Sequence, residues 1–150
     1  MGIKLIANNK KAFHEFFISE VLEAGLALLG PEVKSLRDGK ANLRDSYCRI
    51  QGGELFVHQM HISPYEFGNR ENPEPLRVRK LLVHRHEISH LAKKVDEKGL
   101  TLVPTKLYFK DGRVKLEIGV AKGKHLHDKR ETLKQKEARR EMDKAMKGGY

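Results

Sequence analysis

Residues 113–121 read Arg-Val-Lys-Leu-Glu-Ile-Gly-Val-Ala, and this stretch decides the fold class. Apolar side chains alternate in it with polar or small ones, as in a half-buried strand; the apolar positions are Val114, Leu116, Ile118 and Val120. Asp111-Gly112, directly before it, is a hairpin turn signal that predicts a partner strand over Leu100–Phe109. Pro104 interrupts the partner and predicts a bulge or an edge position there.

Upstream of this hairpin, Gly52-Gly53 predicts a second one that joins Tyr47–Gln51 to Glu54–Ile62. The segment from Ser63 to Pro75 is rich in Pro, Asn and Gly, which is typical of a long surface loop.

Two helices are expected. The first is short, begins at Gly30-Pro31 and ends at Gly39, and the second covers His86–Lys98, with Gly99 as its stop. His14–Leu29 fits both a helical face and strand alternation, and periodicity alone favours a helix slightly. Together these elements predict a mainly antiparallel β-barrel with embedded α-helices.

Charge points to the kind of partner. The 150 residues include 30 Lys and Arg against 20 Asp and Glu, which gives a net charge of +10. Such an excess favours a polyanion, with nucleic acid ahead of an anionic membrane surface. No apolar run approaches the roughly 20 residues that a membrane helix needs. Six Phe, four Tyr and no Trp argue against an extended base-stacking surface. The single cysteine, Cys48, excludes an internal disulfide, suits the reducing cytoplasm and is expected to be a buried apolar side chain.

The charge is concentrated in the last part of the chain. From residue 120 onward there are ten Lys or Arg and five Asp or Glu, so this fifth of the sequence carries +5 of the +10. Its apolar content is too low for a core, which predicts a packed body over residues 1–121 and a basic tail over residues 122–150 that is disordered alone. On a helical projection, one sector holds Lys129, Lys136, Arg140, Lys144 and Lys147, and Ala138, Met142 and Met146 lie opposite.

One pattern suggests an enzyme. His86-Glu87-Ile88-Ser89-His90 fits the H-E-x-x-H motif, whose two His and one Glu serve a zinc-dependent hydrolase. The other six His show no ligand-like spacing to it, so a chance match is favoured and a zinc hydrolase is kept as the alternative. Basic residues crowd the apolar run Arg77–Arg85, and with Lys34, Arg37 and Lys40 they favour a phosphate-contacting surface.

Several strings resemble the SmpB family, the bacterial tmRNA-binding proteins, in order along nearly the whole chain. They are Glu23-Ala24-Gly25-Leu26-Ala27-Leu28, Glu32-Val33-Lys34-Ser35-Leu36-Arg37, Asp45-Ser46-Tyr47, Arg79-Lys80-Leu81-Leu82, Gly119-Val120-Ala121-Lys122-Gly123-Lys124 and His127-Asp128-Lys129-Arg130. The resemblance implies an oligonucleotide-binding (OB-fold-like) barrel with a strand, not a helix, over His14–Leu29. It departs from the family at Ala145-Met146-Lys147, where Ile is usual at the first position.

The resemblance also implies a role without chemistry, cofactor or metal. The protein would bind the tRNA-like domain of tmRNA, promote its alanylation and accompany it to stalled ribosomes. Alanyl-tRNA synthetase and elongation factor Tu would be reached through the RNA. The tail would become helical in the empty message channel, against small-subunit rRNA. A general RNA-binding protein of translation stays open as a further alternative.

By the same resemblance, the RNA-binding residues of the barrel would be Glu23, Lys34, Arg37, Lys40, Asn42, Tyr47, Arg79, Lys80, Leu82 and His84. Those of the tail would be Lys122, Gly123, Lys124, His127, Asp128, Lys129, Arg130, Lys136, Arg140, Lys144, Met146 and Lys147. A carboxylate repels phosphate, so Glu23 is expected to accept hydrogen bonds from a base edge or a 2′-hydroxyl. Leu82 is expected to pack on an unstacked base or a ribose.

Overall fold

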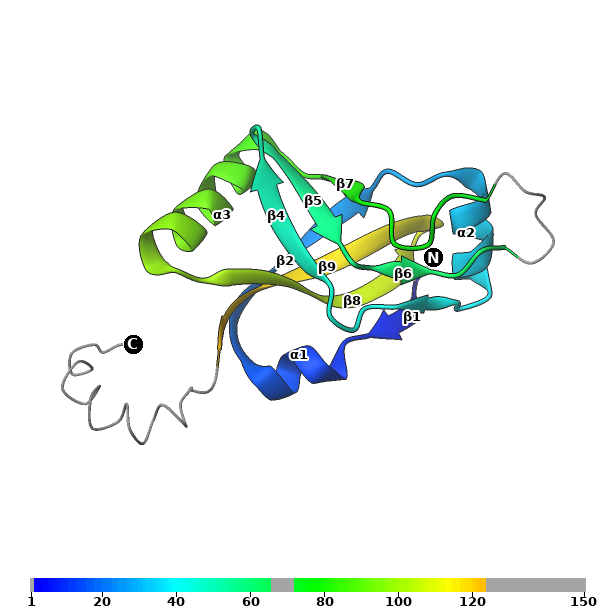
Figure 1. Ribbon diagram of the computed structural model, residues 1–150, viewed down its shortest axis with the longest axis horizontal. Helices are drawn as coiled ribbons and strands as arrows, with labels where there is room; N and C mark the ends of the chain where they lie inside the picture. Colours follow the sequence, from blue (N-terminus) through cyan, green and yellow to red (C-terminus); the bar gives the residue numbers. More distant parts are fainter. Residues whose placement is uncertain (1, 66–71, 124–150) are drawn as a thin grey trace. The chain divides into compact units, whose positions relative to one another are not determined.

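The computed structural model describes residues 2–65 and 72–123 (Figure 1). Its elements are β1 (Ile3–Asn8), α1 (Lys10–Glu15), β2 (Phe16–Leu26), α2 (Gly30–Arg37), β3 (Ala41–Asn42), β4 (Tyr47–Gln51), β5 (Glu54–His58), β6 (His61–Ile62), β7 (Arg79–Leu82), α3 (Arg85–Lys98), β8 (Thr101–Lys110) and β9 (Arg113–Gly123). The chain divides into two units, a larger one of residues 1–14 and 18–122, and a smaller one of residues 15–17 and 123–150. The helices and strands lie almost entirely in the larger unit.

The sheet closes on itself. Its strands follow the order β8-β4-β5-β7-β2-β9, and β9 pairs back with β8, so the ring is complete. The register is antiparallel in the pairs β4–β5, β5–β7, β2–β7, β4–β8 and β8–β9. β1 pairs antiparallel with the other half of β8, and β3 pairs with β6 in a separate small sheet. The predicted class, a mainly antiparallel barrel with embedded helices, is confirmed.

The hairpin that decides the fold has the predicted form. β8 and β9 pair from Thr101↔Ala121 to Lys110↔Arg113, and Asp111 and Gly112 take φ values of 51° and 81° in the turn. The register shifts between Pro104 and Lys106, so the bulge predicted from Pro104 is confirmed. The bulge fits the missing N–H of proline, which cannot join a regular ladder.

Gly119 allows β2 to pass close over this hairpin. A Cβ at that position would lie 3.0 Å from a methyl carbon of Ile18 and 3.1 Å from the methyl of Thr105. A side chain at this position would require the Ile18 and Thr105 side chains to shift, so the close packing favours glycine here.

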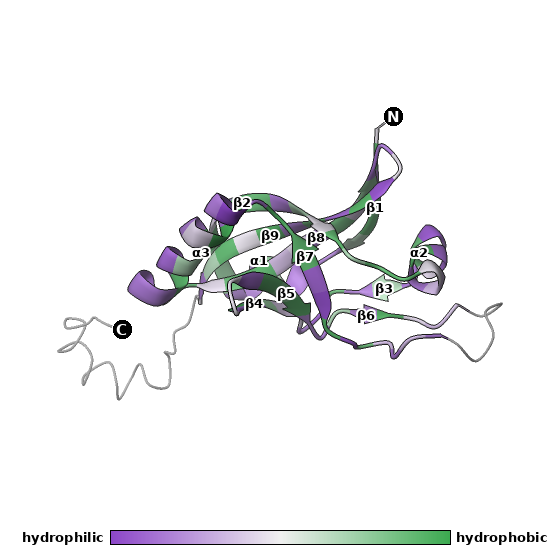
Figure 2. Ribbon diagram, turned by 90° about the horizontal axis from the view of Figure 1, so that it is seen from above, coloured by the Kyte–Doolittle hydropathy of each residue, from purple (hydrophilic) through white to green (hydrophobic). Residues whose placement is uncertain are grey.

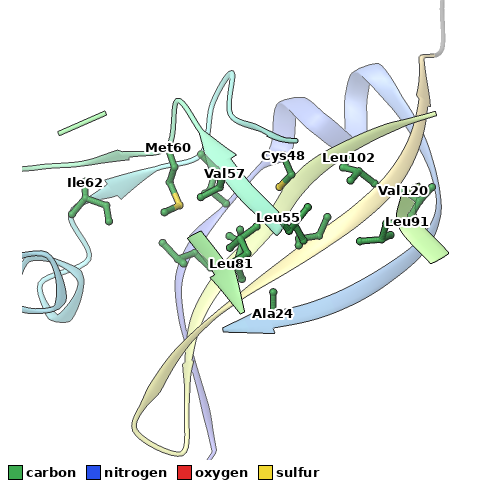
Figure 3. Packing of buried hydrophobic residues seen from close by; sticks show 14 of the residues in the cluster. Ala24, Cys48, Leu55, Val57, Met60, Ile62, Leu81, Leu91, Leu102 and Val120 are labelled. Carbon is green, nitrogen blue, oxygen red and sulfur yellow. The ribbon is translucent and has the colours of Figure 1, made fainter. Parts of the chain in front are cut away.

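The interior is filled by the inward side chains of the strands. Leu55, Val57, Leu81, Leu116 and Ile118 are almost fully buried. Leu91 of α3 joins them and covers one end of the barrel (Figure 3). The hydropathy colouring shows the same alternation along the strands and a mostly polar outer side on α3 (Figure 2). Cys48 is buried in this core, as expected, and burial raises the pKa of its thiol.

The slight preference for a helix over His14–Leu29 is wrong. Most of that stretch is β2, whose burial alternates residue by residue up to Ala24, which points into the core. The barrel supplies pairing partners on both edges of β2, in β7 and β9, and this tertiary pairing outweighs a weak helical periodicity. The short helix α1, which the sequence analysis did not predict, begins after Asn9, whose Oδ1 accepts a hydrogen bond from the N–H of Ala12.

The other elements need small corrections. The expected strand Glu54–Ile62 is broken at Gln59, where φ is 62°, and becomes β5 and β6. Both predicted helices are confirmed, with Gly39 and Gly99 at positive φ after their C-terminal ends. Within the described residues, no helix is long and apolar enough to cross a membrane.

Candidate nucleic-acid interface

A groove of about 680 Å³ lies on the outside of the barrel where β2 and β7 meet the start of α3. β7 leads directly into α3, so both contribute to its wall (Figure 1). Four residues predicted to bind RNA line this groove, namely Glu23, Lys80, Leu82 and His84. The structure thus brings together side chains that are up to 61 positions apart in the sequence, from Glu23 to His84.

Strand pairing explains why they meet. Gly25 of β2 lies opposite Leu82 of β7, and a Cβ on Gly25 would sit 3.4 Å from the Cβ of Leu82. Side chains two apart on a strand share a face, so Glu23 lies on the face of Gly25, and Lys80 on that of Leu82. Leu82 is 52% exposed, a large fraction for leucine, which makes it an apolar contact surface on the groove wall.

Glu23 is held in its charged form. Its Oε2 accepts a hydrogen bond of 2.7 Å from the hydroxyl of Tyr108 and lies 3.4 Å from the ammonium of Lys110. The Tyr108 hydroxyl, against a smaller effect of burial, keeps the pKa of Glu23 below its ordinary value, and the nearby charges of Lys110 and Lys115 add to this. Among the described residues, both contacts reach Oε2, which leaves Oε1 to accept a hydrogen bond from a ligand.

The charged residues that line the groove do not give it an excess of positive charge. Its walls carry three carboxylates, Glu23, Glu54 and Glu87, and three cations, Lys80, Arg85 and Lys115. Lys80 Nζ donates to Glu54 at 3.0 Å in an exposed pair, and Glu87 accepts the N–H of His84 at the start of α3. Arg85 and Lys115 have no ion-pair partner among residues 2–65 and 72–123, and they can contact phosphate. Lys115 was missed because it reaches the groove only through the pairing of β9 with β2, which the sequence does not reveal.

Arg79 is not part of this surface. Its side chain is fully buried, with Nε donating to Glu32 Oε2 at 2.8 Å and Nη1 and Nη2 donating to the carbonyls of Met60 and Pro75. Glu32, only 2% exposed, also accepts two hydrogen bonds from Arg77. Arg79 is therefore not among the RNA-binding residues. Side chains alternate between the two faces of a strand, so Arg79 points inward although its neighbour Lys80 is exposed.

A second cluster of predicted residues lies on α2 and β3. Lys34, Arg37, Lys40 and Asn42 are all exposed, and none of them lines the groove. α2 and α3 lie at opposite ends of the larger unit in both ribbon views (Figures 1 and 2). The residues expected to form one basic surface are therefore divided between the groove, where the charges balance, and a cationic patch at α2.

Tyr47 belongs to neither patch. It lies half-buried on β4, where its ring stacks on that of His58 of β5, with 5.1 Å between centroids and 4° between planes. The two residues face each other in the register of β4 and β5.

The H-E-x-x-H match does not assemble a metal centre. His90 Nε2 lies 2.7 Å from a Glu20 carboxylate oxygen, and Glu87 is engaged by the backbone of His84. The His86 ring stacks on that of His84, with 5.6 Å between centroids. No group of three or more His, Cys, Asp or Glu in the described part of the chain could hold a metal ion. The three motif residues thus have separate structural contacts.

Of the predicted tail residues, the structure describes two. Lys122 and Gly123 are exposed at the end of β9, which runs two residues past the expected end of the body. The remaining ones lie outside the described residues: Lys124, His127, Asp128, Lys129, Arg130, Lys136, Arg140, Lys144, Met146 and Lys147.

The closed barrel, with a groove of mixed charge and an exposed cationic patch at α2, defines a class, that of small basic β-barrel proteins that bind RNA. Comparison with known proteins narrows it. The family model described as SmpB protein matches residues 6–148, so the chain belongs to the SmpB family. It is 74% identical to an SsrA-binding protein of Syntrophotalea carbinolica and 60% identical to one of Geobacter sulfurreducens, each over 147 residues. These alignments cover 98% of this chain and 98% and 96% of the relatives.

Structural comparison agrees. A chain from a solved structure described as "tmRNA-SmpB: a journey to the center of the bacterial ribosome" matches with a TM-score of 0.71 and 47% identity. The match covers 89% of this chain and 94% of that one. The relatives are binding proteins by name, and membership of their family excludes the zinc hydrolase that the sequence pattern left open.

Proposed function

We propose that this chain binds SsrA RNA, also called tmRNA, and acts in trans-translation on stalled ribosomes. The observation that carries the proposal is the 74% identity to an SsrA-binding protein over 98% of both chains. At 74% identity over nearly the whole of both chains, a shared fold and a shared binding surface are expected. The cytoplasm is the place of action, in keeping with a single buried thiol.

The groove is the proposed contact for the tRNA-like domain. Leu82 offers an apolar surface to an unstacked base or a ribose, and Glu23 Oε1 accepts a hydrogen bond from a base edge or a 2′-hydroxyl. Lys115 and Arg85 supply phosphate contacts. The α2 patch, with Lys34, Arg37, Lys40 and Asn42, adds a second set of phosphate contacts at a distance from the first.

The residues from 122 onward are the proposed sensor of the ribosome. Ten Lys or Arg against five Asp or Glu suit a message channel walled by small-subunit rRNA. In this scheme alanyl-tRNA synthetase and elongation factor Tu act on the RNA that the chain holds, and the chain itself needs no cofactor. Bound RNA and an empty channel would then be read by different parts of one protein.

Equilibrium binding tests the proposal. The full chain is titrated with the tRNA-like domain of SsrA RNA and with an elongator tRNA across a salt series. We expect a preference for the SsrA domain that persists at moderate salt, because shape and base contacts are less salt-dependent than phosphate contacts. Equal affinities that fall together with salt would instead identify a general RNA-binding protein.

A matched pair of variants locates the contact. Leu82→Ala is expected to weaken SsrA binding about tenfold, as expected for loss of a base or ribose contact. Leu76→Ala is the control, because Leu76 is also an exposed leucine, at 39%, but lies outside the groove. Equal effects of the two variants would show that the groove is not the contact.

A further inference from the structure

A second recess, separate from the groove, lies between β4 and α3. Its volume is about 480 Å³, within the range of small-ligand sites, about 300–1,000 Å³. Figure 1 shows α3 running beside β4. Apolar side chains contribute most of the lining, among them Ile50, Ala92, Val95 and Leu100. No residue of this recess lines the groove, so the two are distinct sites.

Tyr47 is the aromatic side chain among the residues that line the recess. Its ring stacks on that of His58, which lies outside the recess, and this contact supports the ring from one face. Burial, and after it the nearby Arg49 guanidinium, lowers the pKa of His58, so the imidazole is neutral near pH 7. Stacked neutral rings form a flat surface of the kind on which nucleobases pack.

Two opposite charges stand at the same opening. Arg49 of β4 and Asp96 of α3 both line the recess and are exposed, and neither has an ion-pair partner among residues 2–65 and 72–123. A guanidinium binds phosphate, and a carboxylate accepts hydrogen bonds from the exocyclic amine of a base such as cytosine. An apolar floor, an aromatic side, a phosphate ligand and an amine acceptor are the four contacts that one nucleotide makes.

We propose that this recess binds one unpaired nucleotide with an amino-bearing base, packed beside Tyr47, with its phosphate on Arg49 and its amine on Asp96. The inference rests on the proposed function for the source of the nucleotide, which is the bound RNA. A single nucleotide site is compatible with the low aromatic content, which argues only against an extended stacking surface. Tyr47 and Arg49 are on the same face of the sheet as Lys80, which lines the groove. Arg49 of β4 pairs with Phe56 of β5, and Phe56 pairs with Lys80 of β7.

Octacytidylate and octauridylate are the probes for the first test, with the full-length chain. We expect cytidylate to bind about tenfold more tightly, and its addition to shift the amide resonances of Arg49, Asp96 and Thr101 in nitrogen-15 correlation spectra. This measurement needs no variant, so it holds even if a substitution affects folding. Equal affinities, or shifts confined to the groove residues, would overturn the assignment.

Variants with neighbouring controls give the second test. Asp96→Asn is expected to reduce the preference for cytidylate to less than about twofold, whereas Glu97→Gln, the next carboxylate on α3, leaves it unchanged. Arg49→Gln is expected to weaken both probes about fivefold, and Arg113→Gln, an exposed arginine at the distant hairpin turn, serves as its charge-matched control. Identical behaviour of each variant and its control would refute the site.

Parallel titrations with the SsrA tRNA-like domain separate this inference from the proposed function. If the unaltered chain prefers SsrA RNA and the recess variants bind it like their controls, the recess has no role there and only the inference falls. If the unaltered chain shows no preference for SsrA RNA, the proposed function falls, and the inference, which takes its nucleotide from that RNA, falls with it. A preference that Asp96→Asn and Arg49→Gln both reduce supports both.

Discussion

Replacing Arg79 by alanine should cost far more folding free energy than replacing its neighbour Lys80. Arg79 is fully buried, and its guanidinium bonds to Glu32 and to the carbonyls of Met60 and Pro75. Breaking a buried ion pair by removing one partner costs about 3–5 kcal/mol. Glu32 keeps its two bonds from Arg77, so the lower end, about 3 kcal/mol, applies.

Lys80 is the internal control for this prediction. It follows Arg79 directly and carries the same charge, but its pair with Glu54 is exposed, at 45% and 50%. Exposed pairs contribute about 0–1 kcal/mol. Urea unfolding followed by circular dichroism measures the difference: with a slope of about 2 kcal/mol per molar, Arg79→Ala should lower the midpoint by roughly 1.5 M, and Lys80→Ala by less than about 0.5 M.

A third variant, Arg79→Lys, tests whether the role of Arg79 is structural or is contact with RNA. Arg79→Lys keeps the charge but loses the planar fork, so it should still destabilise the fold, by about 2 kcal/mol. Under conditions in which it remains folded, it should bind SsrA RNA like the unaltered chain. Near-normal stability of Arg79→Ala together with a large loss of RNA affinity would refute the buried placement and return Arg79 to the interface.

Further predictions concern the acid limit, the groove, the thiol and the tail. Burial opposes ionisation of Glu32, but bonds from Arg77, Leu29 N–H and Arg79 outweigh it and lower its pKa below the ordinary 4.5. The contribution of this ionised carboxylate to stability is therefore complete above the ordinary pKa and is lost as pH falls through the lower folded pKa. Urea midpoints should drop as the pH is lowered below about 5, and less so in Glu32→Gln. Glu23→Gln should weaken SsrA binding about fivefold in the same titrations, because a neutral amide accepts a hydrogen bond from RNA less well than a carboxylate does. Burial raises the pKa of the Cys48 thiol, so iodoacetamide should label it slowly in the native chain and quickly in urea. Mass spectrometry measures the labelling, and fast labelling of the native chain would contradict the buried position. Deleting residues 122–150 should leave SsrA binding nearly intact and abolish tagging of stalled chains in a translation assay, and equal loss of both would show that the division of roles is wrong.

The sequence predicted the elements best where local chemistry and long-range pairing agree. The β8–β9 hairpin has a turn dipeptide, alternation on both strands and a proline that marks its bulge, and all three are local signals. β2 shows the opposite case, because its helical periodicity is local while its pairing with β7 and β9 is not. The break at Gln59 also depends on the folded context, whereas Asn9 is a residue type that favours helix N-caps and could have indicated α1.

The candidate site was predicted in its residue types but not in its grouping. A run of basic letters does not say which side of a strand each residue takes, so Arg79 was counted with Lys80 although the two point in opposite directions. Carboxylates from other elements also enter the same groove, and their contribution to its charge follows only from the pairing of β2, β5 and β7.

The balance of charge in the groove separates affinity from specificity. Three carboxylates face three cations there, so the groove cannot supply most of a salt-dependent attraction to RNA. The excess charge lies elsewhere, since residues 120–150 carry +5 of the +10, and α2 adds exposed cations. An interface built in this way should hold RNA through its outlying cations and distinguish it through Leu82 and Glu23. It follows that replacing Lys34, Arg37 and Lys40 by Gln should lower the dependence of affinity on salt, while the preference for SsrA RNA over elongator tRNA stays. Leu82→Ala should instead lower the preference and leave the dependence on salt unchanged.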